Sequence, residues 1–228
     1  CDILIINGAG FEEWLNPAIT DAMENIIIVE ASKGLEFRPD KKNSIEDENE
    51  HNNQDPHFWL NPYLVVKYVK NISDTLTDFD PPGKDFYEKN AENYSAKLLE
   101  LDKWIMEEVK KIPLDKRLLI TNHESFGYFA DRYGFKIIGT IIPGSSTAAS
   151  PSAKEVAQLI DQIKALNVGA IFLETGSDPK IAQQIANETG VAVITGMHTH
   201  SLTGPDGDAP TYIDMIKNNT IKIVESLK

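Results

Sequence analysis

The stretch from residue 84 to residue 112 constrains the fold of this 228-residue chain more than any other. Its apolar residues recur every three or four positions, which places them on one face of a helix. They are Tyr87, Ala91, Tyr94, Leu98, Leu101, Ile105, Val109 and Ile112. Pro81-Pro82-Gly83 precedes the stretch and Pro113 follows it, so helix-breaking residues mark both ends. At about 1.5 Å per residue the predicted helix is roughly 40 Å long, which suits a rod that joins two lobes.

Composition and charge exclude several classes of protein. The hydrophobic content of 41% is ordinary for a globular protein with a buried core, and the net charge of −13 argues against nucleic-acid or anionic-membrane partners. No apolar run approaches the roughly 20 residues of a membrane span, and the start does not resemble a signal peptide. The single cysteine, Cys1, excludes an internal disulfide. Cys1 could be the lipid-bearing first residue of a lipoprotein, but the apolar residues that follow lack a polar spacer, so we interpret it as an incidental cysteine.

The segments before the long helix predict a partial α/β lobe. Residues 3–6 and 26–29 read as buried parallel strands, joined by a turn at residues 7–10 and a helix over residues 12–24. We expect that N-terminal chain is missing here, since such a sheet rarely begins on a central strand. Residues 41–55 predict an exposed acidic loop, and residues 63–76 predict a helix.

Alternating strands and helices beyond Pro113 predict a second α/β lobe. The expected strands are residues 118–120, 137–142, 170–173 and 191–194, and the expected helices are residues 124–133, 152–166, 179–188 and 212–227. The fold class is therefore α/β, with two parallel-sheet lobes joined by one long helix. We place the N-terminal lobe at residues 1–83, the connecting helix at 84–112 and the C-terminal lobe at 113–228. Ligands of such sheets bind at the carboxyl ends of the strands.

Histidines are the strongest candidates for chemistry. His57, His123 and the pair His198/His200 each adjoin a strand or turn, and neutral imidazole is a common zinc ligand. Taken singly, each is more commonly a structural or surface residue, and their spacing alone does not prove a metal site.

Other candidates are weaker. Ser125 lacks the Gly-x-Ser-x-Gly context of a nucleophile, and the segment 144–147 lacks the lysine of a phosphate-binding loop. Glu174 at a strand end could be a ligand or a base, although a backbone hydrogen bond is an equally common role. Asp206 and Asp208 are turn formers first and ligand candidates second.

Four separated motifs together resemble the zinc/manganese solute-binding proteins of bacterial ABC transporters, and the likeness runs from end to end of the chain. The motifs are Asp2-Ile3-Leu4-Ile5-Ile6-Asn7-Gly8 with Glu12 and Trp14, Asp55-Pro56-His57-Phe58-Trp59-Leu60-Asn61-Pro62, His123 with Phe126-Gly127-Tyr128-Phe129 and Tyr133-Gly134, and Tyr212 with Met215 and Asn219.

The resemblance implies two lobes joined by a rigid helix, with a metal ion held by two residues from each lobe. It makes His57 a ligand from the N-terminal lobe and His123 the first ligand from the C-terminal lobe. It also implies that the other N-terminal histidine of the family lies upstream of this chain, together with the first β-α unit of the N-terminal lobe and the signal peptide. The fourth ligand is usually Asp or Glu, and the matching position here is His200, which leaves a part for Asp206 or Asp208 open. Manganese-type members often have Glu at the position of His123, so the histidine favours zinc over manganese.

These observations predict an extracytoplasmic receptor, periplasmic or lipid-anchored, that captures Zn²⁺, or alternatively Mn²⁺, and passes it to an ABC transporter permease. We expect a monomer that binds no nucleic acid and catalyses no reaction. One alternative is a zinc-dependent hydrolase with Glu124 or Glu174 as its base. Another is a cell-adhesion or structural domain in which the histidines are incidental.

Overall fold

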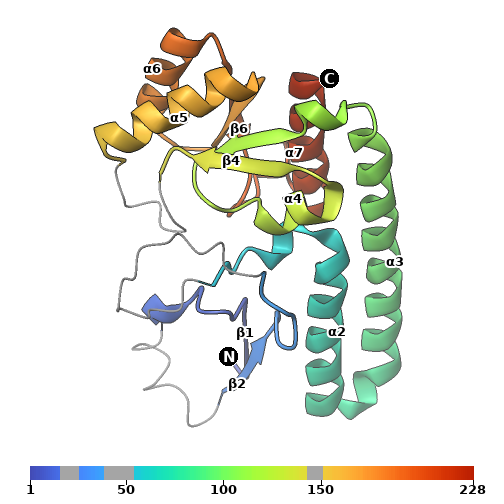
Figure 1. Cartoon of the computed structure of the whole chain (residues 1–228). Coiled ribbons are helices and arrows are strands. Elements are labelled where there is room, and N and C mark those ends of the chain that lie inside the picture. Colours follow the sequence, from blue (N-terminus) through green and yellow to red (C-terminus); the bar gives the residue numbers. More distant parts are fainter. Residues whose placement is uncertain (16–25, 39–53, 143–150) are drawn as a thin grey trace. The chain divides into compact units, whose positions relative to one another are not determined.

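A computed structural model describes residues 1–15, 26–38, 54–142 and 151–228 (Figure 1). The chain divides into two compact units, Cys1–Asp102 and Lys103–Lys228, each of which is described by itself. The boundary falls inside helix α3 (Lys84–Val109), which therefore contributes residues to both units. The predicted α/β class with two parallel sheets and one long helix is confirmed, whereas the predicted lobe limits at residues 83 and 113 stay a prediction.

The first unit contains a parallel pair of strands. Strand β1 (Ile3–Ile6) lies beside β2 (Ile27–Glu30), with Ile3 opposite Ile27. The prediction that this sheet is fully buried was wrong, because Ile5 is 47% exposed. Within the described residues the sheet has two strands, β1 and β2. The turn at residues 7–10 is confirmed, and Gly8 and Gly10 supply its positive φ angles of 79° and 76°.

The predicted helix over residues 12–24 begins as the 3-10 turn η1 (Glu13–Leu15), and its remainder lies outside the described residues. The same holds for residues 41–53 of the predicted acidic loop. The next elements are the short turn η3 (Phe58–Leu60) and helix α2 (Pro62–Phe79), which is longer than predicted. Asn61 starts α2 by accepting a hydrogen bond from the Tyr63 backbone, and Pro62 at the first helical position needs no donor.

The turn η4 (Pro81–Gly83) separates α2 from α3. The predicted apolar face of α3 is confirmed, because five of its eight residues are buried and the other three are half-buried. The buried ones are Leu98, Leu101, Ile105, Val109 and Ile112. The helix ends at Val109 rather than at Ile112, since proline disfavours helical geometry in the residue before it. Lys111 and Ile112 instead donate to carbonyls three residues back, at 3.1 and 3.0 Å.

The second unit is built on one parallel sheet. After the turn η5 (Leu114–Lys116), strands β3 (Leu118–Thr121), β4 (Lys136–Thr140), β5 (Ala170–Glu174) and β6 (Ala192–Met197) pair in the order β4-β3-β5-β6. All pairings are parallel, so the carboxyl ends of β3, β5 and β6 lie side by side at one edge of the sheet. This order makes β5 the strand that joins β3 to β6.

Helices cover both faces of this sheet (Figure 1). Helices α5 (Ala153–Leu166) and α6 (Lys180–Thr189) pack on the face that carries Ile120 and Ile171. Leu119 and Phe172 point to the opposite face, where they lie beside Ile223 of α7 (Tyr212–Leu227). Ser152 and Glu155 form a capping box that begins α5, which confirms the helix predicted there.

Helix α4 (Gly127–Tyr133) begins three residues later than predicted. Residues 124–126 instead belong to a turn in which Ser125 donates from its backbone to His123 O at 2.9 Å. This turn follows the end of β3 and holds His123 outside the helix.

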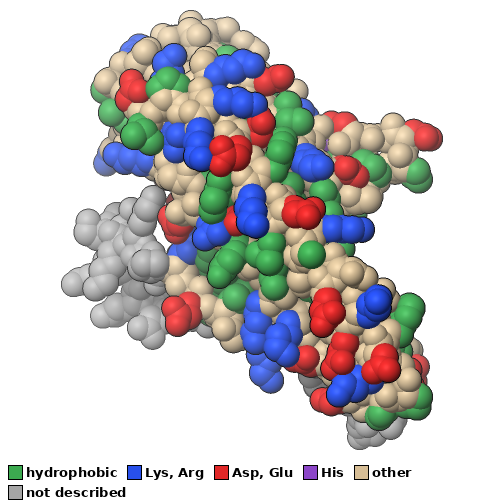
Figure 2. Space-filling model, turned by 90° about the vertical axis from the view of Figure 1, so that its right-hand side faces the viewer, with side chains coloured by type: hydrophobic (Ala, Val, Ile, Leu, Met, Phe, Trp, Pro, Cys, Tyr) green, Lys and Arg blue, Asp and Glu red, His purple; other side chains and the backbone are tan. Residues whose placement is uncertain are grey.

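The surface is mixed in charge. Figure 2 shows acidic and basic side chains interspersed on the face that it draws, as expected where neither sign gathers for a large charged ligand. Cys1 is exposed. Within the described ranges, none of the helices combines the length and the apolar character that a membrane span needs.

Candidate metal centre

His57 lies in the first unit, in the segment that leads into η3. Its Nδ1 lies 2.8 Å from Asp55 Oδ1, and its backbone N–H donates to the same oxygen at 3.0 Å. Asp55 also contacts Arg38 through its other oxygen, at 3.2 Å. A carboxylate that accepts the Nδ1 proton fixes the ring and leaves the lone pair on Nε2, which is the usual arrangement of a metal-ligating histidine.

The segment that carries His57 is tied to the turn after β1. Asn7 Nδ2 donates to Pro56 O at 3.2 Å, and Asn7 Oδ1 accepts from the Tyr68 hydroxyl on α2. Glu12 in turn accepts from the backbone N–H groups of Asn7 and Gly8, at 2.6 and 3.0 Å. The motifs around Asn7 and His57, about 50 residues apart in the sequence, therefore form one hydrogen-bonded structure.

His123 lies directly beyond β3 in the second unit and has no solvent-exposed surface. Its carbonyl accepts from Thr121 Oγ1 at 2.8 Å and from the Ser125 backbone. Its Nδ1 lies 2.6 Å from Glu174 Oε1, so a carboxylate lies beside this imidazole as well.

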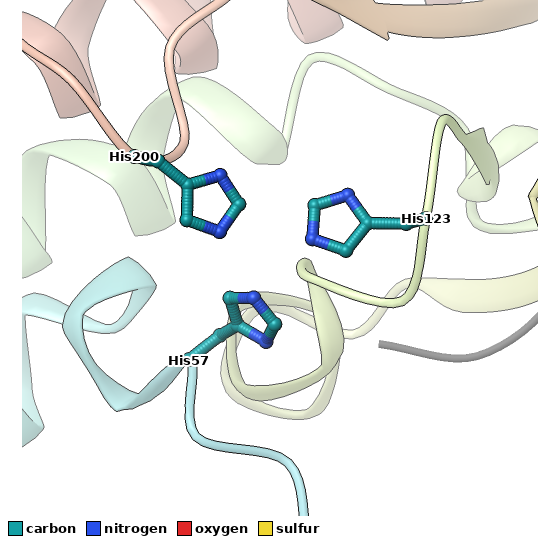
Figure 3. Close-up of side chains that lie close together, drawn as sticks. All are labelled: His57, His123 and His200. Atoms are coloured by element: carbon teal, nitrogen blue, oxygen red, sulfur yellow. The ribbon is translucent and has the colours of Figure 1, made fainter. Parts of the chain in front are cut away.

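His200 follows β6 and meets His123. Their rings stack with centroids 5.1 Å apart and planes 23° apart (Figure 3). His200 Nδ1 lies 3.0 Å from Thr199 Oγ1 and 3.8 Å from Glu174 Oε2. Its side chain is 32% exposed, so this side of the pair is open to solvent. Figure 3 also labels His57, which comes from the segment before η3.

Glu174 is the carboxylate of this cluster, and from the sequence it could equally be a ligand, a base or a partner of the backbone. It ends β5, the strand between β3 and β6, and it is only 10% exposed. Its position at a strand end was the available signal, because adjacent parallel strands bring their carboxyl ends together. The second unit thus places two imidazoles and one carboxylate at three neighbouring strand ends, which is a donor set that suits a divalent metal ion.

His198 is not part of this cluster. It is buried, its Nε2 lies 3.0 Å from Asp208 Oδ1, and its Nδ1 lies 3.4 Å from Thr175 Oγ1. Although burial alone raises the pKa of the Asp208 carboxyl, the hydrogen bond and charge of His198, together with Lys222 and Asn218, hold that pKa below its ordinary value. Asp206 is exposed in the same loop.

Two weaker candidates from the sequence were a nucleophile at Ser125 and a phosphate-binding turn at residues 144–147. Ser125 Oγ donates to the Glu174 carboxylate at 3.4 Å. Among the described residues its partner is therefore a carboxylate and not the histidine that activates a nucleophilic serine. The segment 144–147, predicted to be a turn, lies outside the described residues.

Comparisons with known proteins define the class. A family model described as the periplasmic component A of zinc-uptake complexes matches residues 1–226. The manganese-binding lipoprotein MntA of Halalkalibacterium halodurans is 32% identical over 226 residues, which cover 99% of this chain and 72% of that protein. The high-affinity zinc uptake protein ZnuA of Bacillus subtilis is 35% identical over 238 residues, with the same two coverages of 99% and 72%.

Solved structures agree with the sequence matches. The Mn-bound periplasmic metal-binding protein from Candidatus Liberibacter asiaticus has a TM-score of 0.85 at 26% identity, over 100% of this chain and 81% of that chain. The periplasmic zinc-binding protein TroA from Treponema pallidum has a TM-score of 0.85 at 25% identity and the same coverage of 100% and 81%. Fold and sequence thus define a metal-binding solute-binding protein of the ABC-transporter type. The chain belongs to the family of periplasmic zinc-uptake components A, which confirms the resemblance predicted from its motifs.

Proposed function

We propose that this protein is an extracytoplasmic receptor that binds Zn²⁺ and delivers it to the membrane permease of an ABC transporter. The observation that carries the proposal is the cluster of His123, His200 and Glu174 at the ends of β3, β6 and β5. Family membership supports the transport role. The receptor makes and breaks no covalent bond, so its work is capture and release of the ion.

His57, His123 and His200 are the proposed metal ligands, with any remaining position taken by a carboxylate or water. Asp55 lies on Nδ1 of His57 and so favours coordination through its Nε2, and Glu174 lies beside His123. The participation of His57 is the step that depends on the family, since His57 belongs to the other unit.

Zinc is the proposed cargo because of the donor set. Three imidazoles suit zinc better than manganese, which is a harder ion that prefers oxygen ligands. The names of the relatives divide between the two metals, so the preference for zinc rests on the residues of this chain. Manganese is the second candidate, and the Glu174 carboxylate beside both histidines of the second unit is the observation that favours it.

Elemental analysis of protein purified without a histidine tag tests the receptor. We expect about one equivalent of zinc in the parent, as one site requires, and loss of that zinc in the double variant His57→Ala/His123→Ala. The matched control is Glu124→Ala, which alters the exposed neighbour of His123 and should keep the zinc. A double variant that folds and still carries a full equivalent would contradict this ligand set.

A competition titration with zinc and manganese against one chelating indicator tests the choice of metal. We expect zinc to bind more tightly, and tighter binding of manganese would overturn the zinc assignment while leaving the receptor in place. Turnover of small esters that stops on chelation would instead revive the hydrolase alternative.

A further inference from the structure

The loop between β6 and α7 carries His200, and it closes on itself. Thr203 N donates to Ala209 O at 2.9 Å, and Ala209 N donates to Thr203 Oγ1 at 3.1 Å. Gly207 sits so tightly inside this loop that a Cβ there would lie 2.3 Å from Thr203 Oγ1. Residues 203–209 therefore form a compact ring on the side of the loop that leads to α7.

Asp208 holds this ring to the start of the loop. Its Oδ1 lies 3.0 Å from His198 Nε2, and its Oδ2 accepts from Asn218 Nδ2 at 2.9 Å. Lys222 Nζ lies 3.5 Å from the same Oδ2 and donates to Gly196 O at 2.6 Å. Asp208 thus joins the loop to both β6 and α7, although its side chain is 51% exposed.

His198 is anchored to α7 on its other side. Its backbone N–H donates to Asn219 Oδ1 at 2.9 Å, and Asn219 Nδ2 donates back to His198 O at 2.6 Å. Asn219 is buried, so this reciprocal pair is shielded from water. His200 is two residues further along the loop. The position of its backbone therefore depends on a segment fixed to α7.

We propose that Asp208, through its bond to His198 and its anchors on α7, is a positioning residue that holds His200 in place for the ion. The inference rests on the proposed function, because it takes His200 as a zinc ligand. His200 itself is partly exposed, and its ring stacks on His123 and contacts Thr199 Oγ1 of the same loop, so its position depends on how that loop is held. Loss of the Asp208 contacts allows the His200 segment to swing away, so the principal effect is faster release of zinc.

The test measures zinc dissociation by stopped flow into excess chelator for the parent, Asp208→Ala and Asp208→Asn. Residues that orient metal ligands typically contribute 10–100-fold to affinity, and Asp208 acts one step further out, so we expect roughly threefold to tenfold faster release in Asp208→Ala. Asp208→Asn keeps an oxygen that can accept from His198 but loses the second acceptor, which Asn218 and Lys222 contact, so its release rate should lie between those of the parent and Asp208→Ala. Asp206→Ala removes an equal charge from the same loop and is the matched control.

A double-variant cycle with His200→Ala separates positioning from general destabilisation. If Asp208 acts through His200, Asp208→Ala should change the release rate no further once His200 is gone. Additive effects of the two substitutions would overturn the inference. If Asp208→Ala folds poorly, Asn218→Ala removes one anchor of the same carboxylate and should speed release in the same direction.

The outcomes distinguish the two proposals. A folded parent that binds no zinc overturns the proposed function. A parent that binds zinc and loses affinity in His200→Ala, with no change in either Asp208→Ala or Asn218→Ala, overturns the positioning role alone.

Discussion

Glu174 Oε1 lies 2.6 Å from Nδ1 of His123, at the ends of two adjacent parallel strands. The carboxylate is 10% exposed and the imidazole has no exposed surface, so the pair is shielded from water. A contact between a carboxylate and an imidazole is electrostatically stronger in such surroundings than in bulk solvent. Glu174 therefore acts on the proposed metal ligand whether or not it touches the ion itself.

Replacing Glu174 by alanine should weaken zinc binding by roughly 10–100-fold, which is the typical cost of removing a residue that orients a ligating histidine. Glu174→Gln keeps an acceptor oxygen for Nδ1 and should lose less. Isothermal titration with a competing chelator measures both affinities. Glu124→Gln is the control, because Glu124 is the exposed acidic neighbour of His123. Equal affinities in Glu174→Ala and the parent would show that this contact does not matter for binding.

Acid should weaken zinc binding, because a protonated imidazole has no lone pair for a metal. Each histidine ligand must give up its proton before it can coordinate, so each one adds to the loss of affinity as the pH falls from 7 to 5. Affinity measured across this range should therefore fall steeply in the parent and less steeply in His200→Ala, which has one ligand fewer. A parent affinity that holds constant down to pH 5 would exclude histidine ligation.

The loop that carries His200 should be sensitive at Gly207 and tolerant at Gly204. A Cβ on Gly207 would lie 2.3 Å from Thr203 Oγ1, whereas a Cβ on Gly204 would meet nothing within 4 Å. Overpacking of this kind costs typically about 1–3 kcal/mol, so Gly207→Ala should lower the melting temperature and speed zinc release. Gly204→Ala should match the parent in both measurements. If the two alanine variants behave alike, the ring of residues 203–209 is looser in solution than described.

Helix α3 should show a strong contrast between its buried and exposed faces. Ile105→Ala removes a fully buried side chain and should lower the free energy of unfolding by about 2–5 kcal/mol. Leu99→Ala changes a residue of the same helix that is 38% exposed, and its effect should stay within about 0.5 kcal/mol. Urea unfolding followed by circular dichroism compares the two variants. Equal destabilisation would mean that the periodic face does not carry the packing of this helix.

The regular elements of the fold could be predicted from the sequence because their patterns are local. The spacing of Leu98, Leu101 and Ile105 specifies one face of α3, and that face is the buried one. The ends of elements were less accurate. Helix α3 ends before Ile112 because of Pro113, and α4 begins after the turn that holds His123, since such limits depend on single hydrogen bonds.

The candidate site was predictable in its residue types but not in its partners. The position of His123 after a strand was readable, whereas its contact with Glu174, 51 residues further along, depends on which strands are neighbours in the sheet. Spacing alone did not separate His198 from His200, and the family resemblance was what singled out His200. In the structure His198 contacts Asp208, whereas His200 stacks on His123. A two-residue spacing in a loop does not specify which side chain meets which partner.

The sheet order β4-β3-β5-β6 also sets the order of events in folding. Strands β3 and β6, which lead to His123 and His200, are both paired with β5 and not with each other. The two imidazoles therefore come together only when β5 is paired between β3 and β6. In contrast to a zinc finger, where the metal organises an otherwise unfolded chain, this unit must complete its non-local pairing before its two histidines can share an ion. The proposed metal site thus exists only in the folded sheet, in which β5 separates the strands that lead to the two histidines.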